Sequence, residues 1–171
     1  RIKHDPNPVY LGVTLDRSLT FHQQLKKTAA KVSTRNNLLS KLAGTSWGAS
    51  AQTLKTTALA LCYSTAEYCA PVWCRSSHTK QVDMQLNTSM RTITGTLRST
   101  PLPWLPVLSN IPSPQLRRQE ATAKLLAKVN GNDRLPLHAD ILSHPRARLS
   151  SRRPVWLDPP PEGMRANSAW S

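Results

Sequence analysis

The chain has few acidic residues, and those it has are spread along its length. Nine Asp and Glu residues stand against 23 Lys and Arg residues in 171 positions, which gives a formal net charge of +14. Polymerases and nucleases need grouped carboxylates to hold two metal ions. The sequence also lacks a glycine-rich phosphate-binding loop. We therefore expect no active site on this chain.

Long apolar runs and a cysteine framework are missing too. No run approaches the roughly 20 apolar residues of a membrane-spanning helix, so we expect no membrane partner. The three cysteines are an odd number, and no signal peptide precedes them. A reduced compartment fits this usage better than a disulfide framework. We expect an intracellular, nuclear protein.

A metal site is one interpretation of a cluster that contains Cys62, Cys69, Cys74 and His78. Structural zinc sites usually open with two cysteines separated by two to four residues, and only Cys69 and Cys74 have that spacing. Cys62 and Cys69 also fall on an apolar helical stripe, where a free cysteine behaves as a small hydrophobic residue. We favour core packing for both, and no metal on this chain.

Basic residues without acidic neighbours dominate the first third of the chain. Between Arg17 and Ala66 there are seven Lys or Arg residues and no acid. Such a block repels itself unless an anionic partner lies beside it. Because the charges fall on helical faces, the pattern favours a nucleic-acid partner over an ordinary solvated surface.

One segment has a strand pattern. Residues 9–16 are rich in β-branched and aliphatic residues and are bounded by prolines and a polar turn. We expect one short edge strand here. A single strand cannot satisfy its own backbone groups, so we expect the chain to be the distal part of a larger protein that supplies the sheet.

The first helix is expected over about 21–43. Thr20 and Gln23 match a capping box, and Gly44 is a typical stop. The helical period places an apolar stripe on one face, formed by Leu25, Ala29, Val32, Leu39 and Ala43. It places Lys27, Lys31 and Arg35 one turn apart on another face, with Lys26 beside them. This helix thus offers one side to a core and one to phosphates.

Three further helices are expected. The second covers about 51–69 and should be central and mostly buried, because it has apolar residues on two faces, with Leu61 and Cys62 in one stripe and Tyr63 opposite. The third begins after a cap at Ser76 or Ser77 and ends near Gly95, with an apolar stripe formed by Val82, Leu86, Met90 and Ile93. A proline-rich segment, 98–114, should cross the bundle as an extended strap. The fourth helix covers 114–130, with Ser113 as N-cap and Gly131 as stop. One narrow wedge of it carries Arg117, Lys124 and Lys128.

The sequence thus predicts a mainly α fold. It comprises a bundle of four helices, preceded by one short edge strand and followed by a Pro-rich, basic C-terminal tail. We expect a strand segment over 1–20, a helical domain over 21–130, and a tail over 131–171 with partial order at 135–142 and disorder from about Pro145.

Several motifs, in this order, resemble the region after the catalytic palm in reverse transcriptases of non-LTR, LINE-type, jockey-like retrotransposons. They are Tyr10-Leu11-Gly12-Val13-x-Leu15-Asp16, Leu19-Thr20-Phe21, Tyr68-x-x-Pro71-Val72-Trp73, Arg91-x-Ile93-x-Gly95, the strap from Pro101 to Pro106, Pro114-x-Leu116-Arg117-Arg118, and Pro136-Leu137-His138 leading to Arg148-Leu149-x-Ser151-Arg152. The resemblance covers about residues 9–156.

The resemblance implies a primer grip at Tyr10, Leu11 and Gly12, followed by a helical thumb that holds a template–primer duplex of RNA and DNA. An ordinary buried strand is the alternative for these three residues. The palm and fingers would lie upstream in the same polypeptide, with the catalytic aspartates and Mg²⁺. The chain alone would then be inactive.

Two other interpretations stay open. The chain is either a stand-alone helical nucleic-acid-binding or scaffold protein derived from a mobile element, or an inert remnant of such an element. An open reading frame continuing upstream into strands with paired aspartates would favour the polymerase, and a start codon directly upstream would favour the stand-alone protein.

Overall fold

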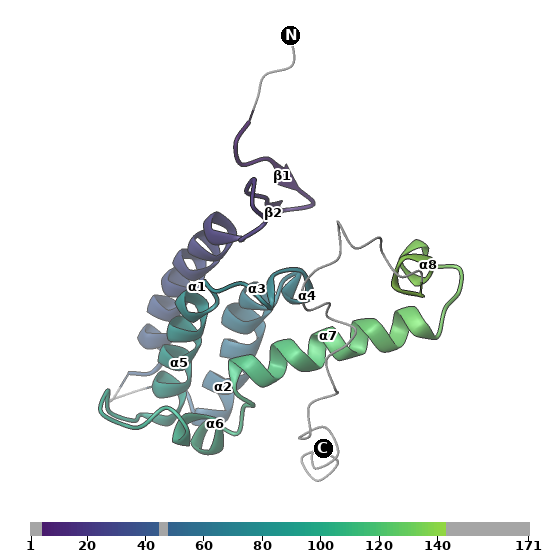
Figure 1. Cartoon of the computed structure of the whole chain (residues 1–171). Helices are drawn as coiled ribbons and strands as arrows, with labels where there is room; N and C mark the ends of the chain where they lie inside the picture. Colours follow the sequence, from purple (N-terminus) through teal and green to yellow (C-terminus); the bar gives the residue numbers. More distant parts are fainter. Residues whose placement is uncertain (1–4, 45–47, 143–171) are drawn as a thin grey trace. The chain divides into compact units, whose positions relative to one another are not determined.

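The computed structural model describes residues 5–44 and 48–142 (Figure 1). These residues are mainly helical, as predicted. The helical elements are α1 (His22–Leu42), α2 (Ala51–Ala58), the π-helical turn η1 (Leu59–Tyr63), α3 (Ser64–Ala66), α4 (Ala70–Trp73), α5 (Lys80–Thr94), α6 (Trp104–Ser109), α7 (Pro114–Asn130) and α8 (Pro136–Leu142). Within these ranges every helix is too short or too polar to cross a bilayer.

The chain divides into two compact units, Arg1–Gln115 and Leu116–Ser171. The first unit contains a β-hairpin and helices α1 to α6. The second contains most of α7, together with α8. The predicted fourth helix therefore has the expected bounds but belongs mostly to the second unit. The predicted tail beyond residue 142, with its arginines and prolines, lies outside the described residues.

The predicted edge strand is in fact a two-stranded hairpin. β1 (Val9–Tyr10) pairs antiparallel with β2 (Val13–Thr14), so that Val9 lies opposite Thr14. Leu11 and Gly12 form the turn with φ angles of 46° and 80°, as a type I′ hairpin turn requires at both central residues. Expecting a single strand was wrong because the segment folds back on itself and supplies its own partner.

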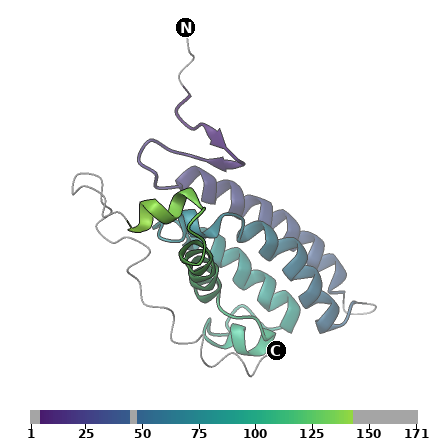
Figure 2. The ribbon, with the colours of Figure 1, turned by 90° about the vertical axis from the view of Figure 1, so that its right-hand side faces the viewer.

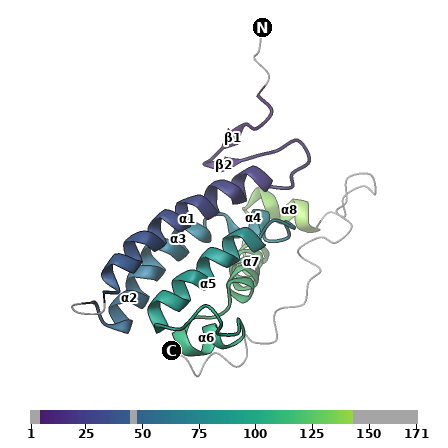
Figure 3. The same cartoon turned by 90° about the vertical axis from the view of Figure 1, so that its left-hand side faces the viewer.

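Three long helical segments of the first unit lie side by side: α1, the run from α2 to α3, and α5 (Figures 2 and 3). α1 packs most extensively on α5. Their facing sides form one hydrophobic core, which includes Leu25, Val32, Leu39, Leu54, Ala58, Cys62, Tyr63, Ala66, Trp73, Val82, Leu86 and Ile93. The apolar stripes predicted for α1 and α5 are thus confirmed, with Ala29 and Ala43 half-buried at the edge.

A buried asparagine joins the three segments within this core. The Asn36 Nδ2 atom donates to the Gln85 carbonyl (2.8 Å), and its Oδ1 atom accepts from the Ser89 hydroxyl (2.6 Å) and the Cys62 thiol (3.4 Å). Asn36 is only 4% exposed. Because buried polar groups need partners, this network fixes how α1, η1 and α5 align.

The second helix is interrupted by the π-helical turn. A π turn inserts an extra residue and changes which side chains face the core. Tyr63 is buried, as expected for a central helix with apolar residues on two faces, whereas Leu61, predicted to lie in the apolar stripe, is 36% exposed. The helix also stops before Cys69, which has a left-handed backbone (φ 52°) and is half-buried. Core packing is therefore confirmed for Cys62 and wrong for Cys69.

The predicted capping box of α1 does not form. The helix begins at His22 after Phe21, which has a φ of 58°, and no side chain caps it directly. Instead the Asp16 carboxylate accepts hydrogen bonds from the Thr20 hydroxyl, the Thr20 amide (3.1 Å) and the Phe21 amide (2.7 Å). A carboxylate competes better than a hydroxyl for the free amides of this turn.

The caps of α5 are partly as predicted. The helix ends at Gly95, whose positive φ of 67° suits a glycine C-cap. Its N-cap is Thr79 rather than Ser76 or Ser77, and it forms no side-chain cap bond. The Ser76 hydroxyl instead donates to the Thr20 carbonyl (2.5 Å), so this segment is tied to the start of α1.

The predicted strap between α5 and α7 contains a short helix. α6 covers Trp104–Ser109, so the segment is not extended throughout. Leu105 and Ile111 are buried and anchor it, while Trp104 is exposed. The partial order expected at 135–142 corresponds to α8.

Candidate nucleic-acid interface

Three of the predicted basic residues of α1 form a solvent-exposed cluster. Lys26, Lys27 and Lys31 lie in the first half of the helix and are all exposed. We call these three residues the lysine cluster. No acid occurs between Arg17 and Ala66, so the helix carries no carboxylate of its own to neutralise them. The cluster is therefore a source of positive potential.

The hairpin is attached to α1 beside this cluster. The Thr14 amide donates to the Oε1 atom of buried Gln24 (2.9 Å), and the Lys27 Nζ atom donates to the Thr14 hydroxyl (3.1 Å). Val13 and Thr14 are buried at this junction. The structure thus brings together two candidate segments that the sequence placed about 15 residues apart.

The tip of the hairpin is exposed. Tyr10 and Leu11 are 68% and 74% exposed, which contradicts the alternative of an ordinary buried strand for these two residues. The Tyr68 hydroxyl donates to the Leu11 carbonyl (2.8 Å). At Gly12 a Cβ atom would lie 3.5 Å from the Tyr68 ring, so backbone conformation, not space, requires glycine there.

Arg35 differs from the lysines that precede it. It is half-buried, and its Nη1 atom donates to the Leu61 carbonyl and to the Thr65 hydroxyl. The same carbonyl accepts a bond from the Thr65 hydroxyl (3.1 Å). Arg35 therefore links α1 to the π-helical region, and the predicted row of three equivalent cations is reduced to Lys27 and Lys31.

The predicted basic wedge of α7 lies in the second unit. Lys124 and Lys128 are exposed, and the Lys124 Nζ atom lies 2.7 Å from a carboxylate oxygen of Glu120, one turn earlier. Arg117 is half-buried and interacts within the chain. The wedge thus offers Lys128 and a paired Lys124 to solvent, which is less positive charge than its sequence indicates.

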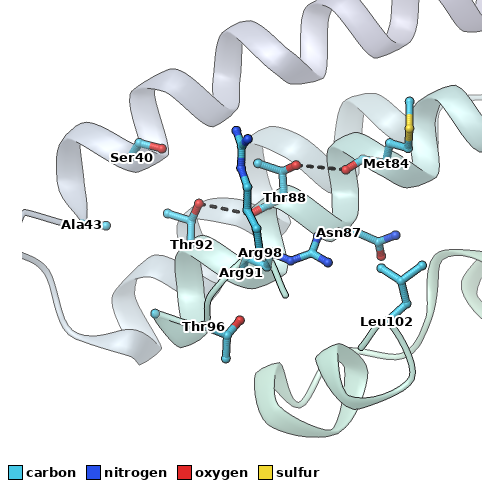
Figure 4. Close-up of a pocket in the computed structure, with 11 residues that line it drawn as sticks. Ser40, Ala43, Met84, Asn87, Thr88, Arg91, Thr92, Thr96, Arg98 and Leu102 are labelled. Atoms are coloured by element: carbon cyan, nitrogen blue, oxygen red, sulfur yellow. Dashed lines mark hydrogen bonds between the residues drawn. The ribbon is translucent and has the colours of Figure 1, made fainter. Parts of the chain in front are cut away.

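A pocket in the first unit was not predicted. It has a volume of about 720 Å³ and lies between the end of α1, the outer side of α5 and the segment that follows α5 (Figure 4). Its lining includes Ser40, Asn87, Thr88, Arg91, Thr92 and Arg98. We call it the arginine pocket. Its two arginines are seven residues apart on either side of the Gly95 cap, so no helical period connects them.

The cysteine and histidine residues do not form the zinc set considered above. Cys62 is buried, and burial raises the pKa of its thiol. His78 pairs instead with His22, with their Nδ1 atoms 3.3 Å apart and their rings perpendicular. Within the described ranges, no group of three or more His, Cys, Asp or Glu side chains is arranged to hold a metal ion.

Comparison of the chain with protein-family models, curated protein sequences and solved structures gives no match. The resemblance to retrotransposon reverse transcriptases therefore stays a prediction from the motifs.

Proposed function

We propose that this chain grips a template–primer duplex on behalf of an RNA-directed DNA polymerase of the non-LTR retrotransposon type. The observation that carries the proposal is the junction of the exposed hairpin tip with the lysine cluster. Tyr10 and Leu11 are exposed at a tight turn, and Thr14 fastens that hairpin to α1 at Gln24 and Lys27. The hairpin and the basic helix α1 are thus directly connected.

The mechanism is electrostatic. Each lysine that neutralises a phosphate releases condensed counterions, so affinity falls as salt rises. Phosphate contacts set the position and register of a duplex without reading its sequence. The hairpin tip adds an apolar aromatic surface, and rings such as Tyr10 stack on bases or sugars without base preference. The chain therefore holds duplexes of unrelated sequence equally well.

The proposal assigns no chemistry to these residues. Any Mg²⁺ and catalytic aspartates belong to the palm of the complete polymerase. The purified chain, given primer, template, Mg²⁺ and all four nucleotides, is expected not to extend the primer. Template-dependent extension by this chain would contradict the assignment.

The test is a salt titration of affinity for an RNA–DNA hybrid. The variant Lys27→Gln/Lys31→Gln should reduce the slope of log affinity against log salt by about 2 units, since each phosphate contact contributes roughly 0.9. The matched control, Lys55→Gln/Lys80→Gln, removes two charges elsewhere in the first unit and should change the slope far less. Equal slopes for the two variants would show that the lysine cluster is only a solvated surface.

A further inference from the structure

The arginine pocket is positively charged, and the duplex grip does not use it. No lining residue is acidic. Figure 4 shows its labelled side chains coming from the end of α1, from α5 and from the following segment. The Thr88 and Thr92 hydroxyls donate to the carbonyls of Met84 (3.0 Å) and Thr88 (3.1 Å). The donors left for a ligand therefore include the Arg91 and Arg98 guanidinium groups and the Asn87 amide.

Arg91 is the more buried of the two arginines. It is half-buried, and its Nη2 atom donates to the Thr100 carbonyl in a hydrogen bond that is long at 3.4 Å. Its Nε atom is buried and has no hydrogen-bond partner in the described chain. A planar guanidinium fork without a carboxylate suits a phosphate group, which it binds through two parallel hydrogen bonds. Arg98 is exposed beside it.

The pocket is separate from the lysine cluster. Ser40 follows Lys31 by nine residues, which at 1.5 Å per residue places it about 13 Å further along α1. A ligand in the pocket therefore meets the other end of α1. Contacts at the two places are independent and their effects should add.

We propose that the arginine pocket binds a phosphodiester group of a nucleic-acid strand, held by Arg91 and Arg98. The inference rests on the proposed function, because it takes nucleic acid as the ligand. It adds a second nucleic-acid contact, separate from the one made by the lysine cluster. Two arginines that line one pocket without an acidic residue present a positive charge that a phosphodiester group can neutralise.

The same salt titration tests the pocket with Arg91→Gln/Arg98→Gln and with Arg98→Gln alone. We expect the double variant to reduce the slope by about 0.9, the contribution of one neutralised phosphate, and the single variant by part of that amount, both beyond the effect of Lys55→Gln/Lys80→Gln. Arg98 is exposed, so the single variant keeps the test valid if loss of half-buried Arg91 impairs folding. Slopes equal to that of the control would overturn the proposal and leave the arginines as neutralising charges for the carbonyl end of α5.

A second measurement distinguishes a strand from free phosphate. Side-chain Nε–Hε NMR signals of Arg91 and Arg98 should shift with a short oligonucleotide, and inorganic phosphate at matched ionic strength should shift them no more than chloride does. Saturation by micromolar phosphate would overturn the assignment to a strand. If the unmodified chain binds no hybrid, the proposed function fails as well. If Lys27→Gln/Lys31→Gln weakens binding and the arginine variants do not, only the pocket fails.

Discussion

Lys31 and Arg35 lie one turn apart on α1 and carry the same charge, but their surroundings differ. Lys31 is exposed, whereas Arg35 donates to a carbonyl and a hydroxyl of the π-helical region. A row of cations at helical spacing indicates a shared face only while the neighbouring helix is regular. The π turn at Leu59–Tyr63 changes that neighbour, and Arg35 becomes part of the fold.

The largest loss of stability should come from a substitution on the buried side of α1. Leu25 is fully buried in the core, so Leu25→Ala should reduce the free energy of unfolding by about 2–5 kcal/mol. Urea denaturation measures this loss. The salt slope for an RNA–DNA hybrid should not change under conditions where the variant is folded. A changed slope would mean that the buried side of α1 also affects nucleic-acid binding by its exposed side.

Asn36 should have the next largest effect. Asn36→Ala leaves the Gln85 carbonyl and the Ser89 hydroxyl without their bonds from this side chain. Each buried group left unsatisfied costs about 1–3 kcal/mol, although Ser89 keeps a bond to the Gln85 carbonyl. We expect a loss of about 2 kcal/mol in urea denaturation. The control is Asn37→Ala, because Asn37 is exposed. Equal losses would exclude the network as the cause.

Periodicity predicted the regular helices well. The stripe that ends with Ile93 gave the buried side of α5, because nothing interrupts that helix before Gly95. Periodicity failed where backbone conformation departs from a regular helix or strand. Leu11 has a positive φ without being Asn, Asp or Gly, so the usual hairpin signal was absent. The π turn likewise has no residue signature that would have predicted the exposure of Leu61.

The candidate site was predictable only in part. The lysine cluster follows from sequence because exposed lysines at one-turn spacing need no partner to be placed. The bond from Lys27 to Thr14 depends on the hairpin, and the arginine pocket depends on how the chain turns after Gly95. Both are tertiary juxtapositions, which helical spacing does not encode.

Single substitutions test directly whether Lys31 and Arg35 have different roles. Arg35→Gln should reduce the free energy of unfolding by about 1.5 kcal/mol, at the lower end for bonds from a charged donor because the residue is only half-buried. Lys31→Gln should change it by less than about 0.5 kcal/mol. The order should reverse in the salt slope, where Lys31→Gln removes about 0.9 and Arg35→Gln less. The same order in both measurements would contradict the division of roles.

The smallest change in stability should come from replacing Asp16, which lies at the junction of the hairpin and α1. The hydrogen bond from the Thr20 hydroxyl, followed by those from the Phe21 and Thr20 amides, holds the pKa of this carboxyl below its ordinary value of 3.8. A lowered pKa means that the unfolded chain binds the proton more readily. The stabilisation is therefore present above the ordinary pKa and lost as pH falls through the lowered one.

Asp16→Asn, followed by urea denaturation between about pH 2 and 6, should reveal this pH dependence. The stability difference from the unmodified chain should be constant near the top of this range and shrink below pH 3.8. Asp5→Asn, which removes a carboxylate away from this junction, is the control. Since hydrogen bonds rather than ion pairs cause the shift, the difference should persist in about 0.5 M salt, where exposed charge pairs are screened. A difference that disappears in salt would mean that Asp16 acts through the positive potential of the lysine cluster, so that cap and cluster would be one electrostatic unit.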